Sequence, residues 1–112
     1  MLKKINRLQK NKDFRRIYQR GKSRAFTGFI LYYRKSGNKE NLHIGFCVSK
    51  KIGKAVQRNL IKRRFREACH HLLDSFTSGY DYVFIVRKSA LEMPFNQLQA
   101  DIDQALNSLA LS

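Results

Sequence analysis

The chain has 112 residues and is 43% hydrophobic, which predicts one domain with a single core over residues 1–112. Its 23 Lys and Arg against 8 Asp and Glu give a net charge of +15, which points to an anionic partner: nucleic acid, a membrane surface or an acidic protein. No apolar run approaches the length of a membrane span, and the first residues lack the apolar segment of a signal peptide. We therefore expect a cytoplasmic protein without a membrane partner.

The basic residues are concentrated in two stretches. Ten lie in residues 1–24 and eight in Lys50–Glu67, whereas residues 89–112 hold three acidic residues and no basic one. A disordered polybasic tail would not show this distribution. We therefore expect a folded domain with one basic side.

The first predicted element is a short helix that Asn11 can cap and Gly21 can end. Phe14 and Tyr18 lie four residues apart on one of its faces, beside Arg15 and other arginines. Aromatic rings interleaved with cations suit single-stranded nucleic acid, which needs stacking faces next to phosphate contacts. The same spacing is typical of core residues, and the sequence leaves both roles open for each ring.

The middle of the chain predicts strands. Ser23–Lys35 is rich in aromatic residues, and a break is expected near Thr27 and Gly28. Leu42–Val48 alternates apolar and polar residues, which predicts a half-buried strand in an antiparallel hairpin with the strand before it. Tyr80–Val86 is a compact aromatic and β-branched run that predicts a central strand.

Tyr32 is a candidate binding residue in the first of these strands. It shares a strand face with Arg34, because side chains two residues apart point to the same side of a sheet. Small residues such as Gly45 in the partner strand would leave room above the sheet for a ligand. We therefore expect Tyr32 to be accessible to a bound molecule.

Residues 55–76 show the periodicity of a long helix, entered through a turn at Gly53. One stripe is apolar and is expected to be buried: Ile61, Phe65, Ala68, Leu72 and Phe76. Another face gathers polar and cationic residues: Asn59, Lys62, Arg63 and Arg66. Arg58 falls on the apolar side, one turn before the stripe, and is expected to reach over the edge of the packing surface.

The cationic face of this helix has two interpretations. It could be the solvated face of an ordinary amphipathic helix, but such faces mix charges of both signs. A ridge of guanidinium and ammonium groups aimed at phosphates explains why acidic residues are missing from it.

A last helix is predicted after Pro94, which suits a first helical turn, with a buried stripe from Phe95 to Leu109. The order helix, strands, helix, strand, helix predicts an α+β fold. In this fold about four strands form a mostly antiparallel sheet that packs with three helices.

The stretch from Lys50 to Glu67 carries a dense motif. It contains Lys54-Ala55-Val56, Arg58-Asn59, Lys62-Arg63 and Arg66-Glu67, preceded by Lys50-Lys51. In this spacing it resembles the signature of the bacterial ribonuclease P protein subunit, and the order of the other segments agrees over nearly the whole chain. The motif and its charge predict this RNA-binding set: Lys50, Lys51, Lys54, Arg58, Asn59, Lys62, Arg63 and Arg66.

The resemblance implies more than RNA binding. It implies a left-handed crossover between a strand and the long helix, and a leader-binding role for Phe14, Tyr18 and Tyr32, with Arg15 beside them. The protein would grip the RNA subunit and the 5′ leader of precursor tRNA. The RNA subunit would carry the active site and its Mg²⁺, no further protein would be required, and the holoenzyme would make the mature tRNA 5′ end.

Without the resemblance, the residues predict a binding protein. The acidic residues form no near pair for acid–base or two-metal chemistry, and no phosphate loop or nucleophile motif is present. We therefore predict no catalytic residue, metal ligand or cofactor in the protein, which should be inactive alone. On a helix, Cys69, His70 and His71 diverge, so Cys69 is expected to border the core and the histidines to face solvent.

Two other functions share the same charge. One is a basic ribosomal-type protein or RNA chaperone without a catalytic partner. The other is a DNA-binding protein with the Arg-rich helix in a major groove, although a helix buried along a sheet is less free to enter one. Composition does not separate these functions, whereas the register of the motif favours ribonuclease P.

Overall fold

The computed structural model describes residues 21–36 and 39–109. Its strands are β1 (Lys22–Ala25), β2 (Phe29–Lys35), β3 (His43–Cys47) and β4 (Tyr80–Val86). Its α-helices are α2 (Ala55–His71) and α3 (Phe95–Ser108), and its short 3-10 helices are η2 (Lys50–Ile52), η3 (Leu73–Ser75) and η4 (Lys88–Glu92). The described part therefore holds two of the three predicted α-helices, and the predicted helix before Gly21 lies outside it.

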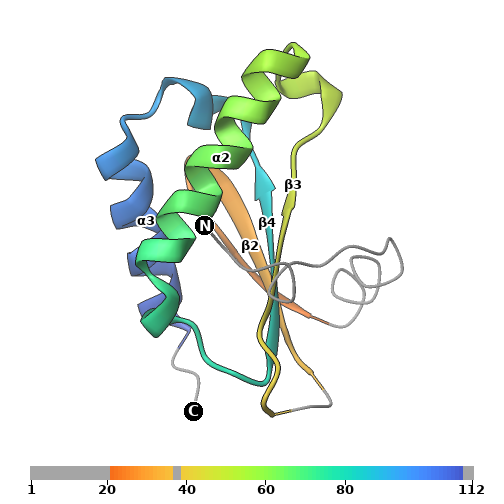
Figure 1. Ribbon diagram of the computed structural model, residues 1–112, viewed down its shortest axis with the longest axis vertical. Helices are drawn as coiled ribbons and strands as arrows, with labels where there is room; N and C mark the ends of the chain where they lie inside the picture. The colour runs from red at the N-terminus through yellow and green to blue at the C-terminus, as the bar shows by residue number, and fades with distance from the viewer. Residues whose placement is uncertain (1–20, 37–38, 110–112) are drawn as a thin grey trace.

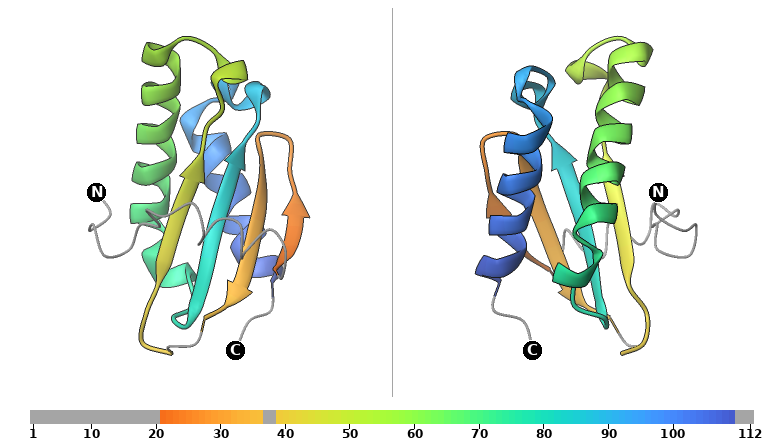
Figure 2. Two further views of the ribbon diagram at one scale, coloured as in Figure 1. Left: turned by 90° about the vertical axis from the view of Figure 1, so that its right-hand side faces the viewer. Right: turned by 60° about the vertical axis from the view of Figure 1, so that its left-hand side comes forward.

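The fold has two layers, one sheet and one layer of helices (Figure 1). Both α2 and α3 cover the same face of the sheet, with α2 on the side of β3 and α3 nearer β2 (Figure 2). No described helix covers the opposite face, and in this sense alone we call it the open sheet face, since Val83 at its centre is fully buried. This arrangement confirms the predicted α+β class.

The sheet is mixed, with strand order β1-β2-β4-β3. β1 pairs with β2 and β2 with β4 in antiparallel orientation, whereas β3 pairs with β4 in parallel. The predicted central place of Tyr80–Val86 is confirmed, because β4 has a partner on each side. A strand with two partners benefits most from an apolar sequence, and four of its seven residues are buried.

The predicted hairpin between β2 and β3 is wrong. β4 lies between these two strands, and β3 occupies the edge of the sheet. The alternation in Leu42–Val48 identified a half-buried strand correctly, but alternation does not specify the neighbour. Consecutive strands often pair, and that tendency misled the prediction here.

The connection from β3 through α2 to β4 is a crossover between parallel neighbours. Seen from the open sheet face, the chain ascends β3, descends behind the sheet along α2 and ascends β4 on the right of β3 (Figure 2, left). This path is left-handed, the uncommon sense for such a connection.

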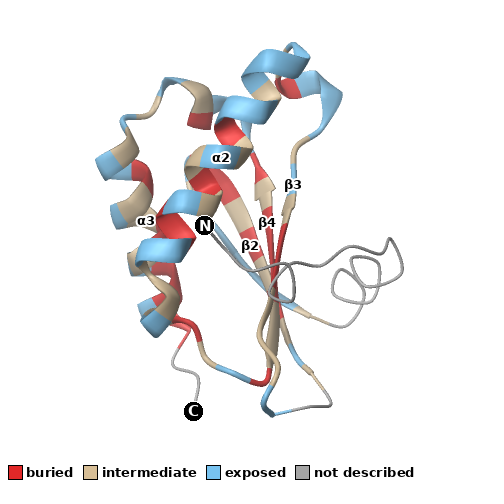
Figure 3. Cartoon of the chain, viewed as in Figure 1, coloured by how far each residue is buried: buried red, intermediate tan, exposed pale blue. Residues whose placement is uncertain are grey.

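The core lies between the sheet and the two helices (Figure 3). α2 contributes Ile61, Phe65 and Ala68, each fully buried. The Phe65 ring meets Phe29 edge-on at 5.9 Å and Phe84 at 6.0 Å between centroids. These aromatic contacts fix α2 against the middle of the sheet and thereby set which of its faces points outward.

The predicted long helix extends too far. The α-helix ends at His71, and η3 follows, so the chain turns back toward β4 five residues earlier than predicted. Phe76 is nevertheless buried, and its ring packs edge-on against Tyr82 at 4.9 Å. The apolar spacing therefore identified core residues correctly, although Phe76 reaches the core from outside the helix.

The predicted strand break is confirmed, because β1 ends at Ala25 and β2 begins at Phe29. Gly28 lies under the chain that leads to α3, where a Cβ atom would come 2.7 Å from Met93 Sδ. A side chain at this position would require the Met93 side chain to move.

Candidate nucleic-acid interface

The entry into α2 is a tight turn that presents lysines to solvent. Ile52 of η2 is buried, whereas Lys50 and Lys51 are exposed. The Lys54 N–H donates to Gln57 Oε1 at 2.9 Å, which satisfies one of the free N–H groups at the helix start. Gly53 has a φ of 158°, and a Cβ atom there would clash with the same Gln57 oxygen. Glycine therefore lets Gln57 cap the helix.

Arg58 has a structural contact. It is half-buried, and its Nη1 donates to the Gly53 carbonyl oxygen at 3.2 Å. The predicted reach over the packing edge is thus a bond back to the turn, which ties the start of α2 to η2. One guanidinium carries five N–H donors, so this bond leaves others for an external acceptor.

The remaining predicted residues of the helix lie together on its outer face. Asn59 and Arg63 are exposed, and Lys62 and Arg66 are partly exposed. Among the described residues, none of these cations forms an ion pair with a carboxylate. Like charges one turn apart repel each other, and an anion bound to this face would relieve that repulsion.

Arg66 has a hydrogen-bond donor without a partner among the described residues. Its Nε is buried and has no hydrogen-bond partner within the described part of the chain. Buried polar atoms in proteins are nearly always paired, because an unpaired donor costs free energy. An acceptor supplied by a bound molecule would satisfy this group.

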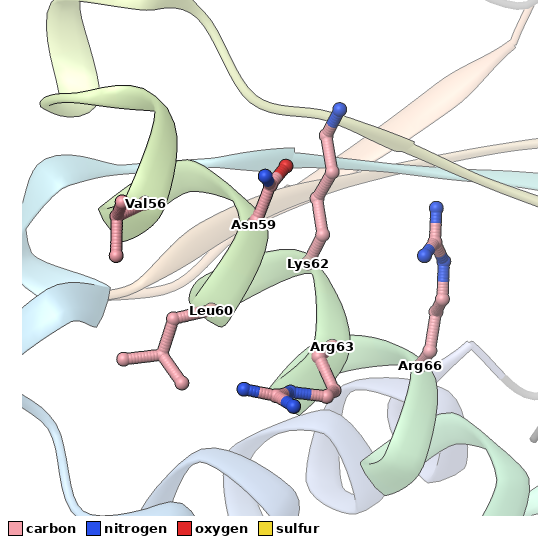
Figure 4. A pocket seen from close by; sticks show the side chains of 6 residues that line it. All are labelled: Val56, Asn59, Leu60, Lys62, Arg63 and Arg66. Carbon is pink, nitrogen blue, oxygen red and sulfur yellow. The ribbon is translucent and has the colours of Figure 1, made fainter.

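A shallow hollow of about 560 Å³ lies along the outer face of α2 (Figure 4). Lys62 and Arg66 extend to one side of the helix, toward the sheet, while Val56 and Leu60 point away from them (Figure 4). The hollow is lined by apolar, polar and cationic side chains: Val56, Asn59, Leu60, Lys62, Arg63 and Arg66.

Sequence reasoning missed two basic residues at the same end of the fold. Arg87 and Lys88 are exposed and directly follow β4, and η4 packs against α2. β3 and β4 are parallel neighbours, so their carboxyl ends lie at the same end of the sheet. The segments that follow them therefore leave the sheet beside each other (Figure 2). The cations were visible in the sequence, but the parallel pairing that brings them near Lys50 and Lys51 was not.

Tyr32 lies on the open sheet face, as its strand position predicted. The register aligns it with Val83 of β4 and, beyond that, with Gly45 of β3. Gly45 is therefore in the same row but two strands away. The next row holds Arg34, Asp81 and His43. The other predicted leader-binding residues lie outside the described residues: Phe14, Arg15 and Tyr18.

The row beside Tyr32 contains a polar pair. His43 Nδ1 and Asp81 Oδ1 are 2.9 Å apart and form a hydrogen bond across β3 and β4. The carboxylate is mostly shielded from solvent, with 14% of its side chain exposed. This contact fixes the edge strand to the centre of the sheet next to the open face.

The cysteine and histidines at the end of α2 lie as predicted. Cys69 is in the core, where burial raises the pKa of its thiol and keeps it neutral. His70 and His71 are exposed, and His71 Nδ1 lies 3.0 Å from Gln99 Oε1 of α3. No group of three metal-ligating side chains is found in residues 21–36 and 39–109.

Comparisons with known proteins give the family of the chain. Residues 2–110 match the protein family described as Ribonuclease P. The chain is 42% identical over 101 residues to the ribonuclease P protein component of Bacillus cereus (strain B4264), a match that covers 90% of this chain and 88% of that protein.

Solved structures agree with the sequence match. The fold superposes on the RNase P protein of Staphylococcus aureus with a TM-score of 0.85 and 34% identity, covering 96% of this chain and 97% of that one. For the RNase P protein from Thermotoga maritima the TM-score is 0.81, with 32% identity and coverage of 89% and 94%. The chain therefore belongs to the ribonuclease P protein family.

Proposed function

We propose that this chain is the RNA-binding subunit of a ribonuclease P and binds both the catalytic RNA and the 5′ leader of precursor tRNA. Ribonuclease P protein components are subunits of this endoribonuclease, whose catalysis lies in the RNA. The holoenzyme hydrolyses the phosphodiester bond that joins the leader to the mature tRNA. The cationic outer face of α2, which has no carboxylate partner among the described residues, is the observation that carries this proposal.

The outer face of α2 is the surface we assign to the RNA subunit. A phosphate bound by Lys or Arg releases its condensed counterions, so each contact strengthens binding most at low salt. α2 is held rigidly by its buried face and by the turn at Gly53. The cations are therefore positioned before RNA arrives, which lowers the entropy cost of binding.

The open sheet face is the surface we assign to the leader. A single-stranded leader offers unpaired bases, and an aromatic ring such as Tyr32 gives them a stacking platform. β3 is the edge strand between this face and α2. A precursor tRNA could thus lie on one side of β3 while the RNA subunit occupies the other.

The protein's own chemistry is limited to binding under this proposal. We assign the bond cleavage and its Mg²⁺ ions to the RNA subunit, because ribonuclease P protein components belong to an enzyme whose catalysis lies in the RNA. No second protein is needed for this role.

No described helix is long and apolar enough to cross a membrane. We propose that the protein works in the cytoplasm, where precursor tRNA is made.

The test is to add the purified protein to a bacterial ribonuclease P RNA at low Mg²⁺ and to follow precursor tRNA cleavage. The protein alone should cleave nothing, and the mixture should cleave at the mature 5′ end faster than the RNA alone. Cleavage by RNA-free protein that a point substitution in this chain abolishes would place the active site in the protein.

A matched substrate pair separates the proposal from its alternative. Precursor tRNA and the same tRNA without a leader differ only in the single-stranded segment. Tighter binding of the precursor by the holoenzyme is expected. Equal binding of both, together with no stimulation of the RNA, would indicate a basic ribosomal-type protein or RNA chaperone.

A further inference from the structure

The outer face of α2 carries two apolar side chains that phosphate binding does not use. Val56 is 79% exposed and Leu60 is 36% exposed, and among the described residues they are the exposed large hydrophobic side chains. They lie one turn apart on the helix, and Arg63 follows on the same line. A surface for phosphates alone would gain nothing from these apolar atoms.

We propose that the hollow formed by these residues holds one unpaired nucleobase of the ribonuclease P RNA, an inference that rests on the proposed function. The face of the base lies against Val56 and Leu60, which removes apolar surface from water. The Asn59 side chain offers a donor and an acceptor to the base edge. Lys62 and Arg66, which extend to the other side of the helix, bind phosphates of the adjoining nucleotides.

The positions of the arginines support this occupant. Figure 4 shows the Arg63 side chain lying along the helix toward Leu60. A guanidinium plane beside an apolar side chain is a surface on which a base can stack. Arg66 lines the same hollow, and its buried Nε has no hydrogen-bond partner within the described part of the chain. A small movement of this side chain toward a phosphate or base oxygen would give the guanidinium an acceptor.

Other occupants fit the hollow less well. A second copy of this chain would bring a charge of +15 against +15. An acidic protein would pair with the cations, but two exposed apolar side chains are a small core for a protein interface. A regular RNA duplex keeps its base faces stacked, so only a bulged or looped nucleotide can present one.

The experiment compares RNA affinity, its salt dependence and base accessibility. In the variant Val56→Ala with Leu60→Gln, affinity for ribonuclease P RNA should fall by about tenfold, within the range for losing one stacked base. The slope of log affinity against log salt should stay at the wild-type value, because the variant keeps every charge. A reagent that acylates the 2′-hydroxyl of any unconstrained nucleotide should then modify one unpaired nucleotide that the wild-type protein protects.

Controls make each outcome decisive. His70→Gln changes an exposed residue of α2 outside the hollow and should leave affinity and protection unchanged. Because Val56 is so exposed, Val56→Ala alone should fold normally and show a smaller loss of the same kind. Wild-type affinity in the double variant would overturn the base-binding proposal. A loss accompanied by a lower salt slope, or with no newly reactive nucleotide, would overturn it as well.

The same measurements keep this proposal separate from the proposed function. If the wild-type protein neither binds nor stimulates the RNA subunit, the proposed function fails. If the wild-type protein does both and the double variant behaves identically, only the base-binding proposal fails.

Discussion

α2 and α3 lie side by side on one face of the sheet, yet their outer faces differ (Figure 1). On α3 the polar groups bond to each other: Gln97 Nε2 donates to Asp101 Oδ1 at 2.8 Å, and Asn107 Nδ2 donates to Asp103 Oδ1 at 3.4 Å. On α2 the described cations have no carboxylate partner, and Arg66 Nε has no acceptor.

The inner faces of the two helices are alike. α2 buries Ile61, Phe65, Ala68 and Cys69, and α3 buries Leu98, Ile102, Ala105 and Leu106. Packing therefore does not require the charge on α2, because α3 packs on the same sheet without any basic residue. This difference indicates that the charge on the outer face of α2 is used to bind a partner and is not needed for folding.

The largest expected effect tests the similarity of the inner faces. Phe65→Ala should lower the free energy of unfolding by ~3–5 kcal/mol, since the ring is fully buried among other aromatic residues. Ile102→Ala on α3 should cost ~2–5 kcal/mol for the same reason. Urea unfolding measures both. A loss below ~1 kcal/mol for either variant would show that its helix is not an essential part of the core.

The next effect tests the difference between the outer faces. Replacing Lys62, Arg63 and Arg66 together by Ala should weaken binding to ribonuclease P RNA at least about a hundredfold, because three side chains that form charge-assisted hydrogen bonds with phosphates are removed. The log–log salt slope should fall by about 0.7–0.9 for each phosphate that is no longer bound. Binding at several salt concentrations measures both quantities.

The control for this triple variant lies on α3. Gln97→Ala and Asn107→Ala remove exposed polar groups from the neighbouring helix and should leave RNA affinity and slope unchanged. A triple variant with the wild-type slope would mean that α2 has only a solvated charged face, which is the interpretation that the sequence left open.

A smaller effect separates the open sheet face from α2. Tyr32→Leu keeps apolar volume but removes the ring, so affinity of the holoenzyme for leader-bearing precursor tRNA should fall by about tenfold. Affinity for mature tRNA and for the RNA subunit should change little. Tyr32→Phe keeps the ring and should retain most of the affinity. Equal losses for precursor and mature tRNA, or a large fall in the thermal midpoint, would contradict a role in leader stacking.

The local structure was predictable because periodicity records which residues are buried. The spacing of Ile61, Phe65 and Ala68 gave both the helix and its orientation, and orientation places Asn59, Lys62 and Arg63 outward. The candidate site on α2 could therefore be predicted almost residue by residue. The exception is Arg58, whose bond to Gly53 depends on the geometry of a turn.

Strand pairing could not be predicted in the same way. Alternation in His43–Cys47 is equally compatible with an antiparallel partner and a parallel one, and the actual partner, β4, follows only after the whole of α2. Pairing is decided by how the whole sheet buries β4 at its centre. With β3 wrongly paired to β2, the sequence could not indicate that the segments after β3 and β4 leave the sheet at the same end.

The smallest expected effect tests this consequence of the parallel pairing. If the RNA-binding surface extends from η2 to Arg87 and Lys88, replacing both by Gln should lower the log–log salt slope by about 0.7–0.9 for each phosphate that the variant no longer binds. Because both residues lie at the margin of the surface, affinity should fall only severalfold, less than in the triple variant of α2.

The matched control is Lys22→Gln with Arg24→Gln, which removes two exposed cations from β1 at the opposite edge of the sheet. Binding to the RNA subunit should keep its wild-type slope in that control. If both pairs lower the slope equally, the protein's overall charge determines the salt dependence, and proximity to α2 does not. If only the Arg87 and Lys88 variant lowers the salt slope, the interface includes the end of the sheet at which β3 and β4 stop.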